Sequence, residues 1–207
     1  MFLGSLNLFS QIGVQAQWHN FIDSSFSFNN KSDKESIAFN QLGYSLDYSF
    51  RLKNYRVEFF PAIFYASKTL ERKNIIGTDF TTDVQTLGVQ LNTHFYFLDI
   101  FGDCHCPTWN KDGDLIKKGI FAWVSFNGYQ VNLNQNSSIK TDFISYGASG
   151  GLGLDIGLSK NWTITPIAGL ELENRPVIEL SQLQAKTDNQ LLYKSIFALR
   201  LSYNWGS

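Results

Sequence analysis

Few side chains in this sequence could do chemistry, and they are spread along the chain. The 207 residues include three histidines, His19, His94 and His105, and two cysteines, Cys104 and Cys106. Nucleophilic catalysis needs a nucleophile and a base within hydrogen-bond reach. His19 and His94 fall on the polar faces of predicted strands that are not neighbours in a simple meander, so no Ser–His–acid set can be assembled. We therefore predict that the protein is not an enzyme and that both histidines fill a polar interior.

The two cysteines stand in a Cys-His-Cys sequence within residues 98–119. These ligands are too close together to wrap one tetrahedral zinc ion readily, and the spacing is not the Cys-x-x-Cys-His of haem attachment. We expect a local disulfide between Cys104 and Cys106, with a free thiol pair and a metal site as the alternatives. The sequence predicts no cofactor and no dedicated metal site.

Charged residues also fall on the polar faces of predicted strands. Most of them lie within a few residues of one end of their strands, whereas Glu171 and Lys194 lie further along. Because buried charges must be paired, we predict an internal network of ion pairs in which Arg200 pairs with Asp155. The network comprises Asp47, Arg56, Glu58, Asp155, Glu171, Lys194 and Arg200.

The elements that position these residues repeat apolar side chains at every second position. This alternation begins at Ile12 and is regular over 42–50, 144–158 and 191–205. A period of two predicts strands, and several reach the ~9–11 residues of a tilted strand that crosses a membrane. The longest apolar run, 59–66, is far shorter than the ~18 residues of a spanning helix. We predict one all-β domain over residues 11–207, an eight-stranded antiparallel up-and-down barrel.

Three features favour a transmembrane barrel, apolar outside and polar inside, over a soluble barrel of the lipocalin type. The polar face is unevenly filled, because the strand at 143–158 offers mostly Gly and Ser there, which leaves space for long polar side chains from the facing wall. A soluble barrel would also be expected to carry more charge than the 17% of this chain. The short turns at 51–54 and 159–161 alternate with long polar connections, and aromatic residues gather near strand ends. The long connections are predicted at 23–37, 67–83, 132–142 and 174–189. A net charge of −1 gives no bulk attraction to nucleic acid.

The N-terminal residues 1–10, MFLGSLNLFS, are typical of the end of a secretory signal peptide whose basic region is missing. An ordinary N-terminal strand is the alternative. An exported chain would bring its cysteines into an oxidising compartment.

The C-terminal strand carries a more specific resemblance. Its alternating residues, which end in an aromatic near the chain end, resemble the assembly signal of bacterial outer-membrane proteins. With about eight strands and an export signal, the chain resembles the small outer-membrane barrels of the OmpA/OmpX kind, without a periplasmic domain. Its signal end, LFS before Gln11, resembles those of Bacteroidetes barrels. The resemblance implies a Gram-negative outer membrane, with lipid and the barrel-assembly machinery as partners. The signal residues are Leu199, Leu201, Tyr203 and Trp205.

An eight-stranded barrel leaves an interior just wide enough for side chains. We therefore expect a filled polar interior and a structural or binding role, exercised through extracellular loops or through residues 98–119 as a contact for a periplasmic or outer-membrane protein. A narrow pore and a lipid-modifying enzyme are the alternatives.

Overall fold

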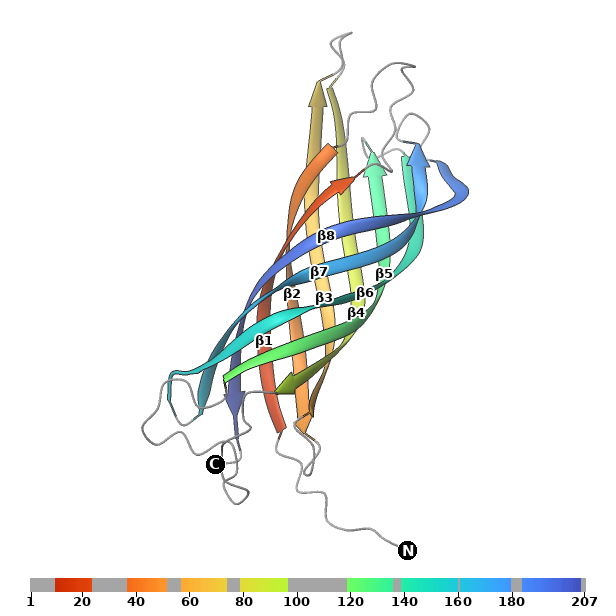
Figure 1. Ribbon diagram of the computed structural model, residues 1–207. Helices are drawn as coiled ribbons and strands as arrows, with labels where there is room; N and C mark the ends of the chain where they lie inside the picture. Colours follow the sequence, from red (N-terminus) through yellow and green to blue (C-terminus); the bar gives the residue numbers. More distant parts are fainter. Residues whose placement is uncertain are drawn as a thin grey trace, which may run out of the picture.

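The computed structural model describes residues 10–23, 37–51, 57–73, 79–96, 119–135, 139–159, 161–179 and 184–205. They form eight antiparallel strands that pair in sequence order and close into one barrel (Figure 1). This confirms the predicted eight-stranded antiparallel up-and-down barrel. The strands are β1 (Ser10–Asp23), β2 (Ile37–Arg51), β3 (Val57–Lys73), β4 (Asp79–Tyr96), β5 (Gly119–Gln135), β6 (Ile139–Gly157), β7 (Trp162–Glu179) and β8 (Gln184–Asn204).

The described residues contain no helix that is long and apolar enough to cross a membrane.

The strands are staggered around the barrel. Following paired residues from Val14 in β1 through each successive strand leads to Leu191 in β8, although Val14 itself pairs with Leu201. The difference between 201 and 191 is a stagger of ten residues. Strands in such closed barrels tilt by about 35–45° from the axis, and Figure 1 shows this inclination. The tilt brings side chains from strands far apart in the sequence to one level of the interior.

Side chains alternate between an exposed apolar outer face and a buried inner face. In β1, Val14 is 56% exposed whereas its neighbour Gln15 is 8% exposed. The same alternation continues through β2, where Leu46 is exposed and Asp47 is buried. Because successive side chains of a strand point to opposite faces, the period of two in the sequence directly gives the two surfaces of the barrel.

Three predicted long connections are largely strand instead. β3 runs to Lys73 and β4 starts at Asp79, so most of 67–83 is a hairpin, and β5, β6, β7 and β8 likewise extend into 132–142 and 174–189. The reason is that alternation of apolar residues identifies only the strand segments that have one apolar face. Backbone pairing continues beyond these segments. The connection at 23–37 falls on residues 24–36, which lie outside the described residues.

The interior is less polar than predicted, because it contains two apolar clusters. One is formed on β3–β6 by Phe64, Ala66, Val84, Tyr129, Val131, Leu133 and Phe143. The other comprises Tyr96, Phe121, Trp123, Ile167, Ile196 and Ala198.

Inward glycines make room for large rings on neighbouring strands. Gly88 pairs with Tyr129, and Gly153 pairs with Phe121. A Cβ at either glycine would overlap the ring of its partner. The small residues on the polar face therefore seat aromatic rings, in addition to the long polar side chains that the sequence suggests.

The strands do not end at one level at the upper end of Figure 1, away from the chain termini. The pairing of β2 with β3 stops at Gly43 and Ala66, and that of β1 with β8 stops at Phe21 and Lys194. Residues 67–73 of β3 and 184–193 of β8 continue beyond these points, paired on one side with β4 and β7. Among the described strands, these two segments are therefore paired along one edge only.

Candidate functional site

Buried charges gather at two levels of the barrel interior. The lower cluster, nearer the chain termini in Figure 1, comprises Asp47, Glu58, Tyr96, Asp155 and Arg200. The upper cluster comprises His19, Tyr129, Glu171, Glu173 and Lys194. All ten residues are buried.

The lower cluster is centred on a bidentate ion pair. Arg200 Nε and Nη2 donate to the two carboxylate oxygens of Asp47 at 2.9 and 2.6 Å. The pair joins β8 to β2 across β1, and it passes over Gly13, where a Cβ would lie 2.6 Å from Arg200 Nε. The guanidinium also lies 4.6 Å from the centre of the Phe60 ring. This geometry fixes Arg200 from three sides, because a planar fork matches both a carboxylate and an aromatic face.

Hydrogen bonds hold the acids at the lower end. The Tyr96 hydroxyl donates to Asp155 Oδ2 at 2.8 Å and lies 3.2 Å from Glu58 Oε2. Asp155 also accepts from the Thr165 hydroxyl. Each carboxylate therefore has polar contacts within the interior, as a buried acid requires.

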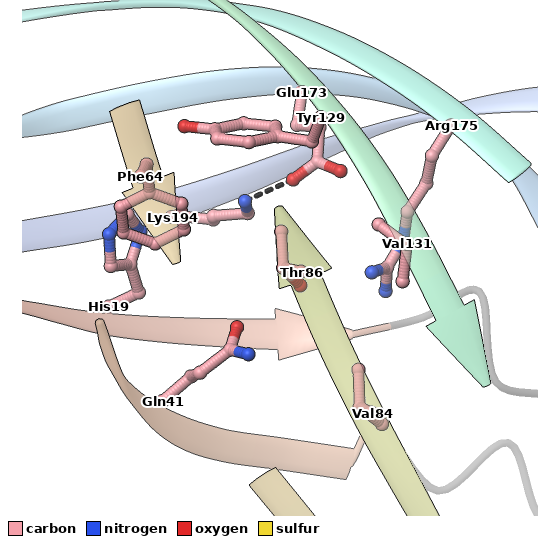
Figure 2. Close-up of a pocket in the computed structure, with 10 residues that line it drawn as sticks. All are labelled: His19, Gln41, Phe64, Val84, Thr86, Tyr129, Val131, Glu173, Arg175 and Lys194. Atoms are coloured by element: carbon pink, nitrogen blue, oxygen red, sulfur yellow. Dashed lines mark ion pairs between the residues drawn. The ribbon is translucent and has the colours of Figure 1, made fainter. Parts of the chain in front are cut away.

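The upper cluster is centred on Glu171, which is fully buried. Its Oε1 accepts hydrogen bonds from Tyr129 and Asn127 at 2.9 and 3.1 Å. Its Oε2 lies 3.6 Å from both Lys194 Nζ and His19 Nδ1. Lys194 also forms a close ion pair with Glu173 (Figure 2). One ammonium thus serves two carboxylates on the adjacent strand β7.

A layer of amides separates the two clusters. Gln17 Nε2 donates to Gln90 Oε1 at 3.0 Å and to Ser45 at 3.1 Å. Gln90 Nε2 lies 3.3 Å from the Tyr129 hydroxyl, which continues the hydrogen bonds to Glu171. Side chains therefore meet across the width of the barrel between the two charged levels.

Two cavities lined by described residues each have a volume of about 20 Å³. This is room for about one water molecule. The upper cavity lies beside the upper cluster (Figure 2), and the second is lined by residues that include Gln15, Asn92 and Trp123. Around these two cavities, side chains occupy the described lumen.

Six of the seven residues of the predicted ion-pair network lie in these clusters, at two separate levels. Glu171 and Lys194 meet in the upper cluster, as their positions suggest. Arg200 contacts Asp47, and Asp155 bonds to Tyr96 and Thr165. Arg56 lies outside the described residues, as do Cys104, Cys106 and all of 98–119 except Gly119.

The predicted assembly-signal residues lie on the outer face of the last strand. Leu199 and Leu201 are exposed, and Tyr203 packs edge-on against Trp162 and Trp205 with ring centres 5.0 and 5.9 Å apart. Asn204 is also tied to the β6–β7 turn, because its backbone N–H donates to the carbonyl of Asn161 at 2.9 Å. This hydrogen bond connects the last residue of β8 to the turn that precedes β7.

Sequence reasoning missed Tyr96, Tyr129 and Thr165 as partners of the buried acids. Tyr129 stands at an inward position opposite Gly88, so a large residue facing a glycine on the next strand was the available signal. Thr165 stands opposite Asp155 in the β6–β7 hairpin, so the short turn predicted at 159–161 was the available signal. Tyr96 carried no such signal, because its role depends on the register of β4, β5 and β6.

The two histidines occupy different surroundings. His19 Nε2 lies 3.1 Å from Gln17 Oε1, and its ring lies beside Phe64. His94 lies between Phe60 and Phe121, with ring centres 4.1 and 4.2 Å away, and its ring is stacked on that of Phe121. Among the described residues, no group of three or more histidine, cysteine or acidic side chains could hold a metal ion.

Comparisons with known proteins show the fold. No family model and no curated protein matches the sequence. The structure is similar to Neisserial surface protein A, with a TM-score of 0.50, 10% identity, and 95% and 97% of the two chains covered. It is also similar to Ail, the attachment invasion locus protein of Yersinia pestis, with a TM-score of 0.50, 10% identity, and 97% and 100% coverage. The chain therefore has the fold of the small eight-stranded outer-membrane barrels.

Proposed function

We propose that the protein is an integral barrel of the Gram-negative outer membrane, with a filled lumen, that acts by binding at its rim. One observation carries the proposal: exposed Leu, Ile, Val and aromatic side chains cover the outside, whereas charged and amide side chains are buried inside. A soluble barrel would have the opposite arrangement. In lipid, all backbone polar groups must be paired, which a closed barrel achieves.

Fractionation of cells that express the chain tests the membrane assignment. We expect the protein in the outer-membrane fraction, resistant to alkaline extraction, and migrating differently on SDS gels before and after boiling. A soluble fraction whose mobility does not change on boiling would contradict the proposal.

The filled lumen supports a role other than solute conduction. Gln17 and Gln90 hydrogen-bond to each other across the interior and line one of the small cavities. We expect no conductance steps from the wild-type protein in planar bilayers, and we expect the Gln17→Ala/Gln90→Ala variant to conduct. Equal conductance of both proteins would favour the narrow pore instead.

We further propose that the protein has no catalytic activity. In support, the contacts of His19 with described residues include Gln17, Glu171 and Phe64, none of which is a nucleophile. His94 lies between two aromatic rings. A His19→Gln/His94→Gln variant should retain whatever function the wild type shows in cells. Loss of that function in a variant that still folds would support the lipid-modifying enzyme.

The rim supports binding because, within the part of the chain that the structure describes, residues 67–73 of β3 and 184–193 of β8 are paired along one edge only. Unpaired N–H and C=O groups of a strand edge accept a further strand. Residues 98–119 are the second proposed contact, on the periplasmic side. The barrel-assembly machinery is a further proposed partner, during biogenesis, through the C-terminal strand.

Two shortened chains separate these contacts. In one, residues 177–188 are replaced by an Asn-Gly turn, which suits a two-residue hairpin. In the other, residues 102–117 are deleted. After cross-linking in native membranes, we expect partners to be lost from the first chain if the rim binds them, and from the second if the periplasmic segment does. Unchanged partners in both heat-modifiable variants would exclude residues 177–188 of the rim and residues 102–117 as contacts.

A further inference from the structure

The second cavity is bordered by a buried donor that no described side chain satisfies. Trp123 lines this cavity and is only 6% exposed, and its indole Nε1 has no hydrogen-bond partner among the described residues. Leaving a buried donor unsatisfied costs free energy. An acceptor in the cavity would remove that cost.

The cavity lies on the side of the amide layer that is nearer the chain termini. On β1, its lining residue Gln15 precedes Gln17, and β1 begins at that end of the barrel. On β4, Asn92 likewise follows Gln90 toward the lower cluster. The cavity therefore lies within the lumen, away from the strand segments of the proposed rim contact.

Other groups of the lining can both donate and accept hydrogen bonds. Asn92 Nδ2 donates to the backbone carbonyl of Phe60 at 3.3 Å, which leaves Asn92 Oδ1 as an acceptor. Ser149 Oγ accepts from Asn127 Nδ2 at 3.1 Å, which leaves the hydroxyl proton of Ser149 as a donor. The amide of Gln15 can act in both ways. The lining thus suits a ligand that itself donates and accepts.

The size and charge of the cavity restrict that ligand further. Apart from His94, none of the lining side chains is ionisable, and moving an ion out of water without an opposite charge is costly. The indole N–H of Trp123 would also repel a cation. The volume is about 20 Å³, and one buried water molecule needs roughly 10–15 Å³. A single water molecule matches the size, the hydrogen-bonding groups and the lack of opposite charge.

We propose that the second cavity binds one water molecule, which bridges β1 to β4 and β5 across the lumen. The water accepts from Trp123 Nε1 and donates to Asn92 Oδ1 and to Gln15 Oε1. A buried water typically forms about three hydrogen bonds and is costly to remove. The water is therefore a structural part of the filled interior, next to the amide layer.

Magnetic resonance of the full-length protein in detergent, with isotope-labelled tryptophan, tests the site. The indole resonance of Trp123 is assigned as the one that disappears in Trp123→Phe. In the wild type we expect a cross-peak between this N–H and water, with the sign of a bound water that does not exchange at once. The absence of such a cross-peak would show that the cavity is dry and would overturn the proposal.

Variants assign the signal to this cavity. Asn92→Leu and Gln15→Met together remove both acceptors, and we expect the bound-water signal at Trp123 to be lost. Gln41→Met is the matched control, because Gln41 is an equally buried amide, 7% exposed against 8% for Gln15, and lines the upper cavity. The control should keep the signal. An undiminished signal in a double variant that remains heat-modifiable on SDS gels would overturn the proposed bridge.

High-resolution crystals give a readout that does not depend on these variants. We expect density for one oxygen atom within hydrogen-bond distance of both Trp123 Nε1 and Asn92 Oδ1. Crystals grown with rubidium or with bromide should show no anomalous scattering peak at this position. Such a peak would show an ion in place of water and would overturn the proposal. Membrane insertion and rim binding would be unaffected by that result, so the two proposals fail separately.

Discussion

The two charged clusters of the lumen solve the problem of buried charge in different ways. In the lower cluster, Arg200 and Asp47 form a two-point contact between β8 and β2, with β1 between them. In the upper cluster, Lys194 is shared between Glu171 and Glu173 on the adjacent strand β7. The lower pair therefore connects three strands around the closing seam, whereas the upper ion pairs reinforce a hairpin that is already paired.

The surroundings differ as well. The lower guanidinium lies against Phe60 and over Gly13, and it lines neither of the two cavities described above. The upper ammonium borders a cavity close to the rim. A charge that loses its partner is costly where water cannot reach it and less costly where it can. The comparison therefore predicts that the barrel depends more on its lower cluster than on its upper one.

The largest effect is expected from Arg200→Met. It leaves the carboxylate of Asp47 buried without its guanidinium partner, which should lower the free energy of unfolding by about 3–5 kcal/mol. Urea unfolding of the barrel in lipid vesicles measures this change. The Asp47→Asn/Arg200→Met double variant should lose clearly less than the sum of the two single variants. Additive losses would show that the two side chains do not act as a pair.

The second-largest loss of stability is expected at a glycine that leaves room for an aromatic ring. Gly153→Ala places a Cβ in the ring of Phe121 and should cost about 1–3 kcal/mol, as judged by the urea midpoint. Gly128→Ala is the control, because its Cβ would meet only Val89, at 3.8 Å. The control should change stability by less than about 0.5 kcal/mol. Equal losses of stability in both variants would mean that the backbone flexibility of glycine, and not the room it leaves for the Phe121 ring, explains its presence.

Loss of the upper ammonium should be milder. Lys194→Met should cost about 1–2 kcal/mol, because water can enter the neighbouring cavity and solvate the two carboxylates. Adding Glu173→Gln to this variant should recover part of the loss in the same urea assay. A loss as large as that of Arg200→Met would remove the proposed difference between the two clusters.

The smallest effect concerns the outside of the lower end. Trp162→Ala removes an edge-on contact with Tyr203 and should cost about 0.5–1.5 kcal/mol beyond the lost apolar area. Thermal unfolding in detergent and in vesicles should show a larger loss in vesicles, where the ring can anchor at the interface. An identical loss in both media would leave only the ring–ring contact as its role.

How far the sequence predicts the site depends on the residue. The buried positions of Asp47, Glu58 and Asp155 follow from the period of two, because each stands between outward apolar residues. The partner of Arg200 does not follow, because it depends on the stagger of the barrel, which brings residues 153 positions apart together. Phe64 and Tyr129 stand on the inner face although apolar residues are expected outside, since glycines on neighbouring strands give their rings space.

The sequence by itself determined the number of strands, the alternation of the two faces and the outward position of most apolar residues. The reason is local: side chains alternate along a strand, so a repeat of two residues encodes both surfaces. The tertiary structure alone decided which buried groups meet, how far the strands extend beyond the segments with an apolar outer face, and where a cavity remains. These depend on register and closure, because tilt and stagger place each inward side chain opposite others that no local pattern identifies.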